Sequence, residues 1–201
     1  MDWFEYEKLA AAHGYTKACG VDEAGRGPLA GPVFAAAVIL PVDCEIEGLN
    51  DSKKISEKKR DLLFDVIKEK AIAYSIASAS VEEIEALNIL QATFLAMRRA
   101  VDGLEIKPDV ALVDGNQKPP LSVPVKTIVK GDSTSASIAA ASILAKVSRD
   151  RYMLEVDEKV PQYCFKQHKG YGTKLHYECI EKYGISEYHR PSFLKKIIGS
   201  K

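Results

Sequence analysis

Apolar residues along this chain fall into short continuous runs and into stripes spaced three to four residues apart. The short runs predict strands at 18–22, 33–40, 73–80, 108–113 and 125–129. The stripes predict amphipathic helices around 62–67 and, most clearly, over 84–101, and a shorter helix is expected over 3–12. Three early strands followed by two strands interleaved with helices are typical of an α/β fold with a mixed sheet.

The second half of the chain continues this pattern and then changes in composition. Asp132 and Ser133 stand where a helix N-cap is expected, before a stretch rich in alanine, isoleucine and leucine that runs to about Glu158. The tail over about 160–201 is richer in tyrosine, histidine and lysine, and it is expected to form a small helical cap. We therefore predict a single domain over 1–201, built on a five-stranded mixed sheet flanked by helices.

Composition is that of an ordinary folded protein. Of the 201 residues, 46% are hydrophobic and 28% are charged, which excludes a disordered or collagen-like chain. The longest uncharged run, 28–42, is interrupted by glycine and proline and is too short to cross a bilayer, and the acidic N-terminus does not resemble a secretory signal. The four cysteines lack a C-x-x-C spacing, so we expect reduced thiols in a cytoplasmic protein without membrane contact.

Charge is balanced overall but clustered locally. The chain has 28 basic and 28 acidic residues, so no global field attracts a nucleic acid. Lysines crowd the stretch 53–60, and Lys166, Lys169 and Lys174 surround a Gly-Tyr-Gly turn. These clusters are compatible with a basic groove, and equally with solvated helix faces.

The most informative pattern is formed by acids that directly follow predicted strands. Asp22 and Glu23 end the first strand, Asp114 ends the fourth, and Asp132 follows the fifth. If these carboxylates converge, each close pair repels by roughly 4 kcal/mol at an effective dielectric near 20, so the cluster must keep protons or hold cations. Oxygen-only ligands favour two Mg²⁺ or Mn²⁺ ions, which can hydrolyse a phosphodiester. The alternative is that these acids are separate turn formers and helix caps, and adjacent strand residues also point to opposite faces.

The loop 25–30, with the sequence Gly-Arg-Gly-Pro-Leu-Ala, superficially fits a dinucleotide-binding fingerprint. We reject that interpretation because Pro28 removes a main-chain donor and because a β-like run follows where a helix is required. Glycines at Gly25 and Gly27 would let main-chain groups approach a ligand, with Arg26 available for a phosphate. A purely structural turn is the alternative.

Several motifs together carry a family resemblance. They are Cys-Gly-Val-Asp-Glu-Ala-Gly-Arg-Gly-Pro-Leu-Ala-Gly-Pro-Val at 19–33, Asp-Ser-Lys-Lys at 51–54, Asn-Ile-Leu-Gln-Ala-Thr at 88–93, Val-Asp-Gly-Asn at 113–116, Gly-Asp-Ser at 131–133, the stretch 136–150, and His-Lys-Gly-Tyr-Gly-Thr at 168–173. In this order they resemble bacterial ribonuclease HII, the type 2 ribonuclease H, over nearly the whole chain. The resemblance implies an RNase H-like fold.

The resemblance also implies roles for individual residues. The catalytic and metal-binding acids would be Asp22, Glu23, Asp114 and Asp132. The loop Gly25-Arg26-Gly27 would sense a ribonucleotide 2′-hydroxyl through main-chain groups, which is the group that separates RNA from DNA. Tyr171 would pack on the sugar just 3′ of the scissile ribonucleotide. Lys53, Lys146 and Arg149 would touch phosphates or brace the acids.

The implied activity is a two-metal endonuclease with Mg²⁺ or Mn²⁺ as cofactor. Its substrates and partners would be RNA–DNA hybrids and DNA duplexes containing single ribonucleotides, cut on the 5′ side to leave a 3′-hydroxyl and a 5′-phosphate. We expect a monomer, and no segment near Lys201 resembles a sliding-clamp-binding tail. A nuclease for all-DNA junctions and a non-catalytic nucleic-acid-binding module are the alternatives.

A second group of possible metal ligands lies in the tail. Cys164, His168, His176 and Cys179 lie within sixteen residues, but their spacing matches no zinc module, so structural roles are favoured. His176 facing a substrate channel is left open.

Overall fold

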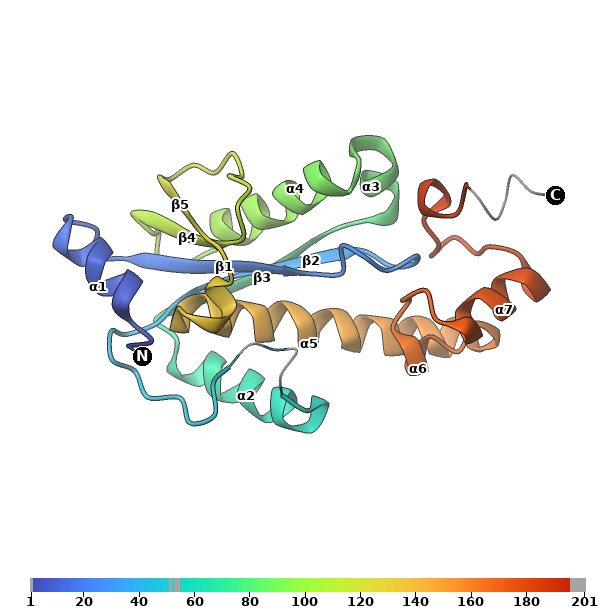
Figure 1. Ribbon diagram of the computed structural model, residues 1–201, viewed down its shortest axis with the longest axis horizontal. Helices are drawn as coiled ribbons and strands as arrows, with labels where there is room; N and C mark the ends of the chain where they lie inside the picture. The colour runs from blue at the N-terminus through green and yellow to red at the C-terminus, as the bar shows by residue number, and fades with distance from the viewer. Residues whose placement is uncertain (1, 51, 53–54, 196–201) are drawn as a thin grey trace.

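A five-stranded sheet with helices on both faces forms the centre of the protein (Figure 1). In this computed structural model, residues 2–50, 52 and 55–195 are described. The strands, in the order β3-β2-β1-β4-β5, are β1 (Ala18–Ala24), β2 (Val33–Ile39), β3 (Ala73–Ala79), β4 (Val110–Asp114) and β5 (Val125–Ile128). The first three strands are antiparallel, and β4 and β5 run parallel to β1. The predicted mixed sheet is confirmed.

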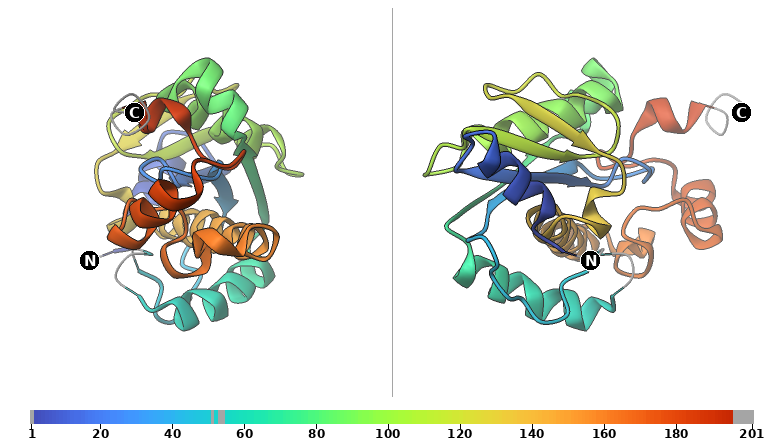
Figure 2. Two further views of the ribbon diagram at one scale, coloured as in Figure 1. Left: turned by 90° about the vertical axis from the view of Figure 1, so that its right-hand side faces the viewer. Right: turned by 60° about the vertical axis from the view of Figure 1, so that its left-hand side comes forward.

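The helices are α1 (Glu5–Ala12), α2 (Glu57–Lys70), α3 (Val81–Leu87), α4 (Ile89–Asp102), α5 (Ala136–Lys159), α6 (Phe165–His168) and α7 (Lys174–Tyr183). Helices α4 and α5 form the layers on the two faces of the sheet, with α2 outside α5, and the shorter helices lie toward the ends of the molecule (Figure 1 and Figure 2). Helix α4 packs on one face through a core that includes Met97 and Val101. Helix α5 packs on the other face, and α2 covers α5 from outside through Leu63 and Phe64.

The N-terminal end of α5 lies directly against β1. A side chain at Gly20 would collide with the main chain of Ser137 and Ile138, so only glycine allows the two elements to approach this closely. This contact fixes α5 relative to the strand that carries Asp22 and Glu23. Burial on both faces also explains why β1 and β2 read as nearly continuous apolar runs.

The helix predicted over 84–101 is interrupted in the structure. Asn88 has a φ of 70°, which ends α3, and its side chain accepts hydrogen bonds from the N–H groups of Leu90 and Gln91 at 3.0 and 3.2 Å. Asn88 therefore caps α4, and the continuous apolar spacing concealed a break between two helices.

The N-cap predicted at Asp132 and Ser133 is also wrong. Both residues lie in a short 3-10 turn, Gly131–Ser133, and the N-cap of α5 is Ser135, whose hydroxyl accepts from the N–H of Ile138 at 3.4 Å. Asp132 therefore lies in the turn before the N-cap of α5 and is not part of that helix. Its place is therefore decided by the chain that leaves β5 and not by α5.

The predicted C-terminal helical segment is present through residue 195. It contains α6, α7 and two 3-10 turns, Pro161–Tyr163 and Pro191–Phe193, and it lies at the C-terminal end of α5 (Figure 1). Phe165 and Tyr163 bury their rings there against Met153 of α5. Within the described residues, no helix is long and apolar enough to cross a membrane.

Candidate active site

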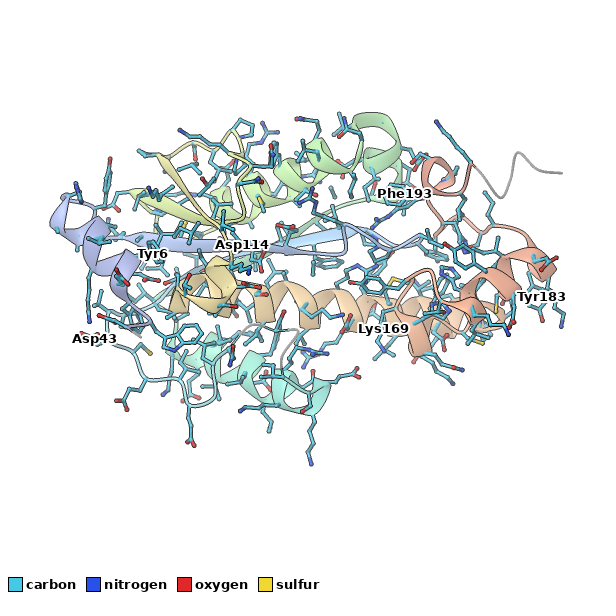
Figure 3. The ribbon with its side chains drawn as sticks, in the orientation of Figure 1. Tyr6, Asp43, Asp114, Lys169, Tyr183 and Phe193 are labelled. Atoms are coloured by element: carbon cyan, nitrogen blue, oxygen red, sulfur yellow. The ribbon has the colours of Figure 1, made fainter. Side chains whose placement is uncertain are left out.

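The predicted acids gather where β4 ends beside β1. The pairing between these parallel strands reaches Val21 and Val113, so Asp22 and Glu23 lie just beyond it and Asp114 is the last residue of β4. Figure 3 places Asp114 beside β1 and next to the turn that leads into α5. This is the carboxyl end of the parallel strands, where ligand sites of open α/β sheets form.

Asp22 is the buried member of the group, with 4% of its surface exposed. Its Oδ1 accepts from the N–H of Glu23 at 2.7 Å, and the hydroxyl of Ser142 on α5 donates to the same carboxylate. The Oγ of Ser142 lies 2.9 Å from that of Ser52, so Ser52 donates when Ser142 is engaged with Asp22. Burial, and then the charges of Glu23 and Asp114, raise the pKa of Asp22 well above its ordinary value.

Glu23 occupies the opposite face of β1, as neighbouring strand residues must. Asp22 contacts α5, whereas Glu23 and Asp114 both line a cavity of about 70 Å³ on the side of α4. Arg26 lines the same cavity and lies 3.4 Å from the Glu23 carboxylate. Asp22 and Glu23 therefore leave β1 on opposite faces, and Asp114, whose charge acts on Asp22 and which lines the cavity with Glu23, lies near both.

Asp132 is brought to the site through the main chain. The Oδ1 of Asp114 accepts from the N–H of Gly131 at 2.7 Å and, at 3.4 Å, from that of Asp132. Asp132 itself is buried, with 6% of its surface exposed. The side chain of Asp114 therefore fixes the turn that carries the fourth acid.

The donor set suits a hard divalent cation. It consists of carboxylate oxygens alone, and both the burial and the neighbouring negative charges that raise the pKa of Asp22 would be offset by positive charge. No group of three or more His, Cys, Asp or Glu side chains among the described residues is arranged so that it could hold a metal ion. Drawing the four carboxylates around an ion thus requires side-chain rotations.

The loop 25–27 extends β1 beyond the acids. Gly25 has a φ of 98°, and a side chain there would collide with the buried guanidinium stem of Arg149, so two independent reasons require glycine. Arg26 and Gly27 form the exposed tip, and the space around Gly27 is open. Main-chain groups at this tip can be approached from solvent.

Tyr171 lies next to this loop although 144 positions separate it from Gly27 in the chain. The N–H of Leu29 donates to the carbonyl of Gly170 at 2.8 Å, which joins the two loops. Tyr171 is 41% exposed, and the Nζ of Lys146 and the Cζ of Arg149 each lie 5.7 Å from its ring centre. The ring thus contacts two cations while the residue remains open to solvent.

Three buried histidines hold the main chain of the Tyr171 loop. The Nδ1 of His176 lies 2.9 Å from the carbonyl of Tyr171, which can only accept, so His176 carries its proton there. Its Nε2, 3.1 Å from the Nε2 of His189, must then accept, and the Nδ1 of His189 accepts from the N–H of Ser186 at 2.9 Å. His168 stacks on His176 at 4.4 Å and accepts from the N–H of Gly170.

This arrangement requires neutral imidazoles. Burial lowers the pKa of His168, and it lowers the pKa of His176 and of His189 to about 4. His176 is fully buried and therefore does not face a substrate channel. These residues serve the Tyr171 loop from within, a role that their spacing did not indicate.

The basic residues expected at the site have different positions. Lys53 lies outside the described residues, as does the stretch near Lys201 in which no clamp-binding tail was recognised. Lys146 forms an ion pair with Asp150 at 2.7 Å. Arg149 is fully buried and donates to main-chain carbonyls only, which makes it a brace of the loops.

Sequence reasoning missed the residues that act through main-chain carbonyls. Arg190, fully buried, reaches the carbonyls of the 25–31 segment, and Arg60 donates to the carbonyls of Ser52 and Ile55 at 2.9 and 2.7 Å. Arginine is usually a surface residue, and nothing in the local pattern around either position signals burial. The contacts of Ser142 with Asp22 and Ser52 likewise have no sequence signature.

The fold, together with the comparisons with known proteins, places this chain among the metal-dependent ribonucleases with an RNase H-like fold. The family model "Ribonuclease HII" matches residues 19–196. Ribonuclease HII of Caldicellulosiruptor bescii is 55% identical over 98% of this chain and 96% of its own, and that of Idiomarina loihiensis is 61% identical over 87% and 94%. This chain belongs to the ribonuclease HII family, whose members cleave RNA in RNA–DNA hybrids.

Solved structures agree with this assignment. Ribonuclease H2 from Pyrococcus horikoshii superposes with a TM-score of 0.75 at 27% identity, covering 92% of this chain and 98% of that protein. The RNase HII of Archaeoglobus fulgidus, solved in complex with PCNA, gives 0.68 at 26% identity over 87% of this chain and 93% of the archaeal one. The resemblance seen in the motifs is therefore confirmed.

We predict that Asp22→Asn stabilises the fold at alkaline pH. The folded-state pKa of Asp22 is raised, so its proton is held more tightly in the folded chain, and stability is lost as pH rises from the unfolded value through the folded one. Asparagine keeps the acceptor oxygen and lacks the charge. In chelator-containing buffer at pH 8, we expect the variant to unfold about 3 °C or more above the wild type, which corresponds to about 1 kcal/mol at this size.

Thermal unfolding followed by circular dichroism at pH 8 and at pH 4 measures this difference. The gain should shrink toward pH 4, where Asp22 is protonated in the folded wild type. A gain that is equal at both pH values would show that charge repulsion at Asp22 is not its cause.

We predict that the buried histidines make the fold acid-sensitive. The folded pKa of His176 and of His189 lies near 4, below the unfolded value of about 6.5, so the unfolded chain binds more protons between these values. Stability is complete above pH 6.5 and is lost as pH falls toward 4. The slope of the unfolding free energy against pH should be smaller in His189→Gln, measured by urea denaturation.

His13→Gln provides the matched control, since His13 is exposed on the turn after α1. Its slope should equal that of the wild type. An unchanged slope in the His189 variant would contradict the role given to the buried cluster.

Proposed function

We propose that this chain is a two-metal endonuclease that cuts RNA–DNA hybrids and also single ribonucleotides embedded in duplex DNA. The cut falls on the 5′ side of the ribonucleotide and leaves a 3′-hydroxyl and a 5′-phosphate. The observation that carries the proposal is the hydrogen bond from Leu29 to Gly170, which joins the loop with the exposed Arg26–Gly27 tip to the Tyr171 loop, next to the acidic edge of β1. Residues 1–201 act as one catalytic domain in this proposal.

The positions of three residues along helix α5 support the proposal, because they fix the distance between the acids and the Tyr171 loop. Ser142, Lys146 and Arg149 follow one face of the helix, and they contact Asp22, the Tyr171 ring and both loops in turn. At 1.5 Å per residue, Ser142 and Arg149 are about 10 Å apart along the axis. The helix therefore holds the Tyr171 platform at a fixed offset from the acids, which suits recognition of a ribonucleotide together with its 3′ neighbour.

The two loops supply the complementary recognition elements. The exposed main chain of Arg26 and Gly27 can hydrogen-bond a 2′-hydroxyl, which only a ribonucleotide presents. The half-exposed ring of Tyr171, in contact with Lys146 and Arg149, offers a flat surface for a sugar. A deoxyribose packs closely there because it lacks the extra oxygen, so an RNA–DNA junction is favoured.

The acids would perform the chemistry with divalent ions. Asp22, Glu23, Asp114 and Asp132 would hold Mg²⁺ or Mn²⁺, and such ions supply activation of a water and stabilisation of the departing 3′-oxygen. An RNase HIII with 20% identity to this chain has been solved with Mn²⁺. Arg26, 3.4 Å from Glu23, can meet a phosphate oxygen beside the acids.

We predict that Asp114→Asn abolishes cleavage without loss of binding. The amide keeps an oxygen that can accept from Gly131 and loses the negative charge. The cleavage rate of a duplex with one ribonucleotide should fall at least about a hundredfold, since metal ligation is worth several kcal/mol in the transition state. Affinity for the duplex should stay equal or increase, because one acid no longer repels phosphate.

Asp109→Asn is the matched control, because Asp109 lies at the other end of the same strand and binds the N–H groups of Thr16 and Lys17. Its cleavage rate should remain near that of the wild type. Equal cutting of a duplex without any 2′-hydroxyl would favour the all-DNA nuclease. Absence of turnover by the wild type with Mn²⁺ would favour a binding module, and either result would refute the proposal.

We predict that Tyr171→Ala reduces the preference for an RNA–DNA junction. Loss of a stacking platform costs roughly 1–3 kcal/mol, so the ratio of kcat/KM for a junction to that for uniform RNA in a hybrid should fall about tenfold or more. The ring is half-exposed, so the thermal unfolding temperature should change little. Tyr177→Ala, which removes a similarly exposed ring from α7, is the control. An unchanged ratio would exclude the platform role.

A further inference from the structure

Two arginines lie completely buried beneath the loops of the site. Arg149 comes from α5 and Arg190 from the segment after α7, and both have none of their surface exposed. Among the described residues, no carboxylate lies within 4 Å of either guanidinium. Such groups are expensive to bury, so their hydrogen bonds must have a purpose that an apolar side chain would not serve.

Arg190 uses its planar fork on the carbonyls of a single segment. It donates to Gly25 at 2.7 Å, to Arg26 at 3.1 Å and to Pro28 at 2.9 Å. Two further bonds, of 2.8 and 2.6 Å, reach the carbonyl of Gly31. Lysine cannot make this pattern, because its single ammonium has three donors and no fork.

Arg149 likewise donates hydrogen bonds to main-chain carbonyls, both in this segment and in the neighbouring Tyr171 loop. Its guanidinium donates to Ala30 at 3.0 Å and to Pro32 at 3.2 Å, and a third bond of 3.0 Å reaches Lys169. Burial, and then the charge of Arg149, lower the pKa of Arg190 to about 9, which places the two cations close together. The pair thus binds the 25–32 segment and the start of the Tyr171 loop from below.

The direction of the captured carbonyls determines what the tip presents. In a trans peptide the C=O and the following N–H point in opposite directions. The carbonyls of Gly25 and Arg26 are turned inward to Arg190, so the N–H groups of Arg26 and Gly27 are turned outward at the exposed tip. No hydrogen bond within the described part of the chain uses these two N–H groups.

We propose that Arg190 is a positioning residue for ribonucleotide recognition, which aims the N–H groups of Arg26 and Gly27 at the 2′-hydroxyl by holding their neighbouring carbonyls inward. The inference rests on the proposed function, and it adds the element that makes the tip selective. Arg149 keeps that tip at a constant distance from Tyr171. Neither arginine touches substrate, because both are covered by the loops that they hold.

The test is equilibrium binding with cleavage disabled by Asp114→Asn in every chain. Two duplexes of equal sequence are compared in Mg²⁺ buffer, one with a single ribonucleotide and one entirely of DNA, and the ratio of their Kd values is the ribonucleotide preference. Arg190→Lys retains the charge but not the fork. It should lower the preference about threefold to tenfold, the equivalent of one lost neutral hydrogen bond, with all-DNA affinity unchanged.

Leu194→Ala is the matched control for lost stability. Leu194 is buried four residues after Arg190 and packs on Leu29 and Ile180, so its truncation loosens the same region without releasing a carbonyl. Its ribonucleotide preference should equal that of the parent chain. If Leu194→Ala lowers the preference as much as Arg190→Lys, the effect is loss of packing and the inference is overturned.

Two further outcomes are separable. A preference that survives in Arg190→Lys overturns the inference and leaves the proposed function intact, whereas a parent chain with no preference overturns the proposed function and the inference with it. If Arg190→Lys is unfolded at the assay temperature, the two Kd values are measured again at a lower temperature at which circular dichroism shows the variant to be folded. An unchanged preference under those conditions also overturns the inference.

Discussion

Repulsion among carboxylates at the carboxyl edge of β1 and β4 is the constraint on which this structure depends. Asp22 is buried and lies close enough to Glu23 and Asp114 for their charges to raise its pKa. A charged group in such a place disfavours the folded state unless its neighbours support it or a cation relieves it. The hydrogen bonds from Ser142 and the Glu23 N–H are that local support, and they hold the carboxylate in place.

The opposite charge is concentrated a short distance along α5. Arg149 and Arg190 are buried under the loops without a carboxylate partner among the described residues. A chain with zero net charge thus separates its charges locally, with acids at the sheet edge and cations below the 25–32 and Tyr171 loops. In the proposed function, this separation is what would attract a phosphate backbone to the loops and cations to the acids, although no global field exists.

Helix α5 couples these two regions. It is fixed on β1 by the close approach at Gly20, and it contributes contacts to Asp22, to the Tyr171 ring and to both loops. A rigid helix preserves distances that flexible loops could not hold by themselves. Arg60 adds a second link, since it joins the carbonyls of Ser52 and Ile55 to Asp150 of the same helix.

Local patterns in the sequence predicted the strands, most helices and the four acids. The spacing of apolar residues, the turn residues and the ends of strands can all be read from neighbouring positions in the chain. The sequence did not show that Asn88 separates two helices or that Ser135 is the N-cap of α5. Both depend on a backbone turn, which apolar spacing does not reveal. Only the tertiary structure decided the neutral state of His176 and the burial of Arg190, whose carbonyl partners lie more than 150 positions away. Burial and the direction of a main-chain carbonyl arise from packing between distant segments, and no single stretch of sequence contains them.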